Sequence, residues 1–200
     1  PLRVKHIPDP IVYQQFEEAG TDLGQLINKK KNIASMKSLD SNLDKALGRL
    51  SGGLYVVTAS QGEGSTFRQS AMVASWVSQA SFSPPGITIA VAKERAVENL
   101  LHTGDSFALN ILEHNNHQSL LRQFLQSFKP GENRFANLDI KLSPGNQPLL
   151  NEALAWLEGT VNQRMECGDH WLIYAEIKYG KVIKKDGVTA VHHRKTGANY

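Results

Sequence analysis

Residues 62–92 hold an unusual number of hydroxyl side chains among apolar residues, and two cations follow directly. The hydroxyls belong to Ser65, Thr66, Ser70, Ser75, Ser78, Ser81 and Ser83, and the cations to Lys93 and Arg95. Clustered hydroxyls, backbone N–H groups where a strand meets a loop, and a Lys/Arg pair suit the binding of a phosphomonoester. A Ser-rich strand whose hydroxyls bond the backbone, beside two solvated cations, explains the same composition equally well.

A second candidate is the tripeptide Gly168-Asp169-His170, which lies between two predicted strands. A Gly-Asp turn with an imidazole at the start of the next strand can aim a titratable donor into a cleft. The simpler alternative is a turn followed by a packed or solvated histidine. The residues alone leave both interpretations open.

The remaining histidines argue against a metal site. His192 and His193 are adjacent in a predicted strand, so their side chains point to opposite faces and cannot chelate one ion. His114 and His117 have no carboxylate or thiol at metal-ligand spacing nearby. The sequence also lacks a nucleophile elbow, a P-loop and a GxGxxG turn between strand and helix. We therefore expect no metal in this chain.

The elements that must position these residues are mostly short strands. Apolar runs predict strands at residues 54–59, 71–80, 87–92, 107–112, 154–165, 170–179 and 188–193. Short helices are expected at 96–101 and 118–128, and a loop at 145–150. Many strands with few helices favour a barrel, which also removes exposed strand edges. The predicted fold class is mainly β with peripheral helices.

The first 31 residues differ from the rest. Residues 2–5 alternate like a strand and residues 11–28 have a helical period, but such a pair cannot bury its apolar face alone. We therefore expect residues 1–31 to be the tail of a preceding domain, 32–42 a linker and 43–200 the barrel domain. The run Lys29-Lys30-Lys31 is either a solvated linker or a contact for phosphate or an acidic partner.

The barrel domain is expected to open with a helix. Ser41 and Asp44 have capping-box-like spacing, Leu43, Leu47 and Leu50 form an apolar stripe, and Gly52-Gly53 ends the helix.

Composition excludes several functional classes. A formal net charge of +3 is too small to indicate nucleic acid binding. No apolar run approaches the roughly 20 residues that a membrane helix needs. Cys167 is the only cysteine, so an intrachain disulfide is impossible, and a reducing, cytoplasmic location is expected. The chain opens on Pro1, which predicts a fragment or a processed product.

Several segments, in the right order, resemble one family. Residues 71–85 resemble the FMN-binding segment of the flavin reductase-like family, as do the strands at 53–58 and 107–112 and the Gly168-Asp169-His170 turn. Within that family the chain is most similar to the C-terminal flavin reductase module of photosynthetic-type flavodiiron proteins. Residues 1–31 then resemble the last strand and helix of the preceding flavodoxin-like domain.

The resemblance implies an FMN-binding split β-barrel that forms a homodimer, takes electrons from NAD(P)H and passes them to a flavodiiron core that reduces oxygen to water. It implies His170 at the flavin edge or the incoming nicotinamide. The residues implied to bind FMN are Ser75, Trp76, Val77, Ser78, Gln79, Lys93, Arg95, Gly168 and Asp169. No protein acid or base is obligatory, because the cofactor carries the chemistry.

Two alternatives remain at this point. The module could be an FMN relay that accepts electrons from reduced ferredoxin, for which Lys29-Lys30-Lys31 would suit an acidic partner. It could also be a split barrel that has lost flavin and serves as an interaction domain.

Overall fold

The computed structural model describes residues 41–126, 128–129 and 131–197, and four isolated positions before them. Those four, Val12, Phe16, Ala19 and Gly20, are helical. The predicted strand at 2–5, most of the predicted helix at 11–28 and the linker before residue 41 lie outside the described residues.

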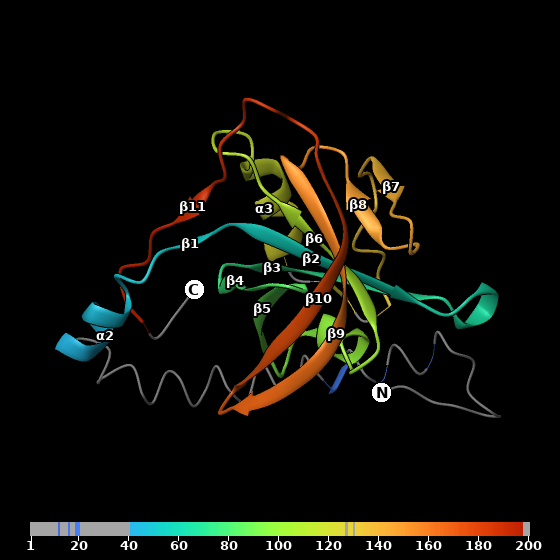
Figure 1. Cartoon of the computed structure of the whole chain (residues 1–200). Helices are drawn as coiled ribbons and strands as arrows, with labels where there is room; N and C mark the ends of the chain where they lie inside the picture. The colour runs from blue at the N-terminus through green and yellow to red at the C-terminus, as the bar shows by residue number, and fades with distance from the viewer. Residues whose placement is uncertain are drawn as a thin grey trace.

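Seven antiparallel strands form the main sheet (Figure 1). They are β2 (Tyr55–Gln61), β3 (Arg68–Ala74), β4 (Val77–Phe82), β5 (Pro85–Ala92), β6 (Ser106–Ile111), β9 (Ala155–Cys167) and β10 (His170–Val182). Their order is β3-β2-β6-β9-β10-β5-β4, so the consecutive strands β3 and β4 stand at opposite edges. This confirms the predicted class, mainly β with peripheral helices.

Smaller elements surround this sheet. Two short pairs of strands are β1 (Gly52–Gly53) with β11 (Val191–His192), and β7 (Ile140–Leu142) with β8 (Pro148–Leu150). The helices are α2 (Asn42–Leu47) and α3 (Gln118–Leu125), with 3-10 turns η2 (Gly64–Thr66) and η3 (Ala96–Leu100). The Ser41 hydroxyl accepts a hydrogen bond from the Asp44 amide at 3.1 Å, so the predicted cap of α2 is confirmed.

The main sheet curls around one apolar interior. Met72 of β3 and Ile89 of β5, from opposite ends of the sheet, belong to the same buried cluster as Leu109 of β6 and Ile173 of β10. A flat sheet could not bring its two ends to one core, so the strands wrap towards closure. The interior is the barrel that the sequence predicts.

A second core covers the outer face of β2. Val56 packs there with Leu120 and Phe124 of α3, while its neighbour Val57 points into the barrel. Successive strand residues face opposite sides, so cover on both faces explains why β2 is buried without interruption from Val56 to Ser60.

The predicted strand at 71–80 is wrong in one respect, because it is two strands. β3 pairs with β2 up to Ala74, whereas β4 pairs with β5 from Val77. Ser75 and Trp76 between them carry the chain from one edge of the sheet to the other. The apolar run continues across this break because both strands line the same interior.

Three other predictions need correction. Residues 148–150 form β8, although a loop was expected over 145–150, because buried Thr58 donates to the Pro148 carbonyl and buried Asn110 accepts from the Leu150 amide. The last strand spans only Val191–His192 of the predicted 188–193. The leucines predicted as the apolar stripe of α2 are exposed in the described residues, namely Leu43, Leu47 and Leu50.

Candidate functional site

The break between β3 and β4 places Trp76 against His170. His170 is the first residue of β10 and pairs with Ala92 of β5, and the Ala90 amide of the same strand donates to the Trp76 carbonyl. The indole and imidazole centroids are 5.0 Å apart, with the rings tilted by 43°. Two residues that are far apart in the sequence therefore meet over β5.

A tight turn orients His170. Cys167 pairs with His170, so Gly168 and Asp169 form a two-residue hairpin loop in which only Gly168 has a positive φ, of 61°. A glycine at the first position of such a loop is typical of hairpin turns. The turn brings the Asp169 carboxylate to 2.7 Å from the Nδ1 of His170.

The contact with Asp169 sets which hydrogen bonds the Nε2 of His170 can make. His170 is only 9% exposed, whereas the Asp169 side chain is 82% exposed. When Nδ1–H donates to the carboxylate, Nε2 is an acceptor in the neutral ring and a donor in the protonated ring. The structure therefore shows the Gly-Asp turn holding the His170 imidazole, while its aim into a cleft stays a prediction.

Ser75 supplies a buried hydroxyl that lacks a partner. Its residue is 6% exposed, and its Oγ makes no hydrogen bond within the described residues. A buried hydroxyl left unpaired costs about 1–3 kcal/mol. β1 lies against the backbone of Ser75, because a Cβ on Gly52 would come within 2.1 Å of the Ser75 carbonyl oxygen. The Ser75 hydroxyl is thus a buried polar group next to Trp76 whose hydrogen-bonding capacity no described residue uses.

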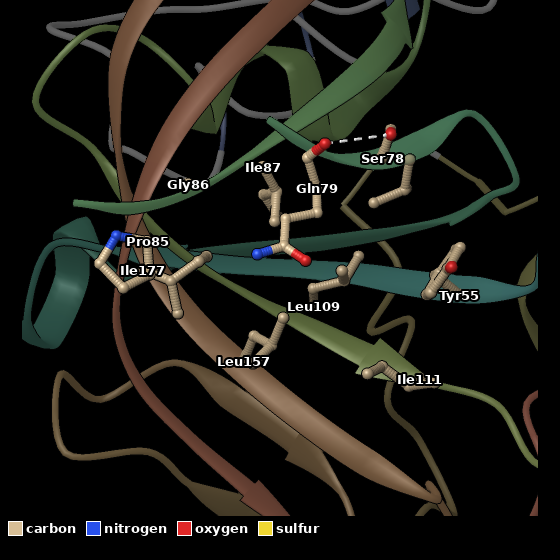
Figure 2. Close-up of a pocket in the computed structure, with 11 residues that line it drawn as sticks. Tyr55, Ser78, Gln79, Pro85, Gly86, Ile87, Leu109, Ile111, Leu157 and Ile177 are labelled. Atoms are coloured by element: carbon tan, nitrogen blue, oxygen red, sulfur yellow. Dashed lines mark hydrogen bonds between the residues drawn. The ribbon is translucent and has the colours of Figure 1, made fainter. Parts of the chain in front are cut away.

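The next three residues line a separate groove. Val77, Ser78 and Gln79 line an apolar groove of about 330 Å³ together with residues of β2, β5, β6, β9 and β10 (Figure 2). Figure 2 also shows the hydrogen bond of 3.2 Å that the Ser78 hydroxyl donates to the Gln79 carbonyl. The other lining residues are Tyr55, Pro85, Gly86, Ile87, Leu109, Ile111, Leu157 and Ile177. Burial raises the pKa of the Tyr55 phenol there.

The structure therefore divides the predicted segment. Ser75 lies beneath β1 and Trp76 meets His170, whereas residues 77–79 contribute to the groove. The resemblance implies an FMN-binding role for all five residues, and the break between β3 and β4 places them in different surroundings.

Lys93 lies beside the Gly-Asp turn. Its amide donates to the Asp169 carbonyl at 3.0 Å, and its ammonium pairs with the Glu166 carboxylate and lies 5.3 Å from the Trp171 ring. The hydrogen bond and charge of Lys93 lower the pKa of Glu166. Arg95 follows at the N-cap of η3, where its amide donates to the Ala92 carbonyl. Lys93 thus contacts the turn that carries His170, and Arg95 lies two residues further along the chain.

Two arginines near this region escape sequence reasoning. The Arg194 guanidinium lies 4.9 Å from the Trp76 ring, and the Arg164 guanidinium lies 4.4 Å from the Trp171 ring. Arg164 also pairs with Glu98 in a largely buried ion pair. None of these contacts has a local sequence signal. The Arg194–Trp76 and Arg164–Glu98 contacts join residues more than 60 positions apart, and the Arg164–Trp171 contact joins neighbouring strands.

Arg194 also affects the titration of a neighbouring histidine, His192. The pKa of His192 is lowered first by burial and then by the positive charges of Arg194 and His193.

Within the described residues, no group of three or more His, Cys, Asp and Glu side chains is arranged to hold a metal ion. No helix among them is both long enough and apolar enough to cross a membrane.

Comparisons with known proteins give one family. The family described as flavin reductase like domain matches residues 47–198. The diflavin flavoprotein A 1 of Synechocystis sp. is 52% identical over 199 residues, which cover 100% of this chain and 34% of that protein. The chain thus spans about a third of the length of this curated relative.

Solved structures agree with the sequence comparison. The NADH:FAD oxidoreductase of Streptomyces globisporus superposes with a TM-score of 0.66 at 26% identity, covering 74% of this chain and 85% of the other. The same enzyme in complex with NAD and FAD fragments gives a TM-score of 0.64 at 24% identity, covering 78% and 87%. The curled antiparallel sheet is therefore a flavin reductase split barrel.

Proposed function

Because this chain belongs to the flavin reductase-like family, we propose that it is an NAD(P)H:flavin oxidoreductase module that binds FMN. The observation that carries the proposal is the buried hydroxyl of Ser75, which has no partner among the described residues, next to the Trp76–His170 contact. We further propose that the module supplies electrons to the flavodiiron core of a longer protein that reduces oxygen to water. Its similarity to one third of a diflavin flavoprotein supports that placement.

The residues present fit a flavin. When bound, FMN supplies the atom that accepts hydride from nicotinamide and the means to release electrons one at a time. Ser75 gains the hydrogen-bond partner that it lacks among the described residues. Trp76 offers an aromatic surface, and β1 packs against the backbone of Ser75.

The remaining candidate residues have distinct roles in this proposal. The Gly168-Asp169 turn orients the imidazole of His170, which contacts the flavin edge or the nicotinamide. Ser78 and the backbone of Gln79 hold the cofactor from the groove, next to Val77. Lys93 and Arg95 bind the phosphate, for which Lys93 exchanges its exposed ion pair with Glu166.

An absorbance spectrum followed by mixing with electron donors tests this function. The purified chain incubated with FMN should retain a flavin spectrum after gel filtration, and NADH or NADPH should bleach it. Bleaching by reduced ferredoxin but by neither nucleotide would favour the relay alternative. The exposed cations Lys45, Arg49 and Lys195 near the Arg194–Trp76 contact suit an acidic protein donor. Failure to retain any flavin would favour an interaction domain.

The phosphate role predicts a preference among flavins. FMN should bind more tightly than riboflavin, and Arg95→Ala should weaken FMN by about 1.5–3 kcal/mol, the usual worth of a hydrogen bond to a charged group. Riboflavin affinity should not change in this variant. Fluorescence titrations with FMN, FAD and riboflavin measure all three affinities.

Arg122→Ala is the matched control, because Arg122 lies on α3, which packs against the second core rather than the candidate site. Equal affinities for FMN and riboflavin would remove the phosphate role of Lys93 and Arg95.

The open groove predicts a homodimer. Apolar side chains from six strands line it, and one of these strands, β4, is an edge strand. A second copy related by a two-fold axis would cover both, as closed pairs commonly do. Light scattering at micromolar protein with FMN should give twice the chain mass. A monomer mass under these conditions would contradict this assembly.

A reducing compartment, for which we propose the cytoplasm, suits the exposed Cys167.

A further inference from the structure

A C-terminal strap, residues 191–197, ties the site to the first helix. β11 pairs with β1 through Gly52 and His192, and the Gly197 amide donates to the Asp44 carbonyl at 2.7 Å. Between these two fixed points, Arg194 donates from Nη2 to the Leu47 carbonyl at 3.2 Å. The strap is therefore bonded on both sides of Arg194.

The same guanidinium contacts Trp76. Its central carbon lies 4.9 Å from the indole centroid, within the range of a cation–π interaction. Trp76 is 36% exposed, so burial alone does not define the rotamer of this large side chain. A planar cation held by the Leu47 carbonyl gives the indole a fixed neighbour.

Close backbone approaches leave the strap little freedom to shift. A Cβ on Gly48 would come within 2.6 Å of the Thr196 amide nitrogen, and one on Gly52 within 2.1 Å of the Ser75 carbonyl oxygen. At both positions the nearest atoms belong to the backbone, which cannot move aside as a flexible side chain can. The strap, α2 and the Ser75-Trp76 segment are thus packed as one unit.

From this geometry we infer that Arg194 is a positioning residue, which holds the Trp76 indole in the orientation in which it meets His170. The inference deepens the proposed function and rests on it for the use of that orientation in flavin binding. Arg194 acts through Trp76, because the structure shows its guanidinium against the indole and the Leu47 carbonyl. Its contribution to the ligand is therefore expected through the placement of an aromatic surface.

The test compares Arg194→Gln, Arg194→Lys and the control Lys195→Gln, in the whole 200-residue chain. Lys195 is an exposed cation of the same strap, so its loss changes the net charge equally. The first measurement is the indole N–H resonance of Trp76 without flavin, assigned by its disappearance in Trp76→Phe. The second is the FMN dissociation constant. The third is the pKa of His192 from an NMR titration.

We expect Arg194→Gln to shift or broaden the Trp76 resonance and to leave those of Trp156 and Trp171 in place. FMN affinity should fall by about 3- to 10-fold, in keeping with the strength of a cation–π contact. Arg194→Lys should restore part of both effects, since it keeps the charge and loses the planar fork. The pKa of His192 should rise in Arg194→Gln, because the guanidinium charge holds it down.

The outcomes separate this inference from the proposed function. An unmoved Trp76 resonance in Arg194→Gln, with FMN affinity unchanged, overturns the positioning role even if the chain is a flavin reductase. A shifted resonance in a chain that binds no flavin supports the positioning of Trp76 and contradicts the proposed function. If Lys195→Gln changes the resonance and the FMN affinity as much as Arg194→Gln does, the positioning role is also overturned, because the loss of one positive charge would then explain both effects.

Discussion

Replacing His170 with alanine is expected to slow the reduction of bound FMN by saturating NAD(P)H about 10- to 100-fold. Loss of one preorganised donor costs roughly 10²–10³-fold at strongly dependent sites, and hydride transfer needs no proton relay, so the loss should be smaller here. The imidazole is buried, held by Asp169 and placed against Trp76. Stopped-flow bleaching of bound FMN measures the rate.

FMN affinity should change little in this variant, because the phosphate contacts are assigned to Lys93 and Arg95. Asp169→Asn should slow reduction in the same direction but by less, since an amide oxygen can still accept from Nδ1. His193→Ala is the matched control, an exposed histidine just beyond β11.

The competing interpretation is that His170 only packs against Trp76. In that case His170→Ala should lower the melting temperature, while the folded, FMN-loaded fraction keeps the wild-type rate. A melting curve recorded beside the kinetics separates the two results. An unchanged rate would end the functional role of His170 and leave the fold and the family intact.

The sequence predicts most of the barrel, and the reason is burial. Strand β2 is buried from Val56 to Ser60 because both of its faces are covered, and its apolar residues make it recognisable in the sequence. The sequence does not indicate the break at Ser75-Trp76, because the strands on both sides of it are similar in character. β3 and β4 line the same interior, and only their pairing partners, β2 and β5, differ.

The candidate site was partly predictable. The Gly168-Asp169 turn is local, so the sequence places His170 at the start of a strand and next to a carboxylate. The contact of Trp76 with Arg194 depends on the pairing of β1 with β11, which joins the two ends of the domain. Long-range pairing of two-residue strands has no sequence signature, and this is why Arg194 could not be predicted.

The other large expected effect is on stability and concerns Arg164. This arginine on β9 pairs with Glu98 of η3, and the two side chains are only 11% and 13% exposed. Arg164→Met should lower the free energy of unfolding by about 3–5 kcal/mol, because it leaves the Glu98 carboxylate buried without its cation. Urea denaturation without added flavin measures the change and avoids any contribution from ligand binding.

The molecule offers a matched control for this prediction on the same aromatic ring. Lys93 also contacts Trp171, but its ion pair with Glu166 is 32% and 66% exposed. Solvent screens such a pair, so Lys93→Met should cost less than about 1 kcal/mol. If both variants lose the same stability, contact with Trp171 rather than charge burial sets the cost.

A double variant separates the pairing from the packing of Arg164. Arg164→Met combined with Glu98→Leu removes both charges, so it should recover more than half of the stability lost in Arg164→Met alone. The unrecovered part reports the contacts of the guanidinium with Trp171 and with the Nδ1 of His102, which lie at 4.4 Å and 2.6 Å. A double variant no more stable than Arg164→Met would mean that the Glu98 charge is not the source of the loss.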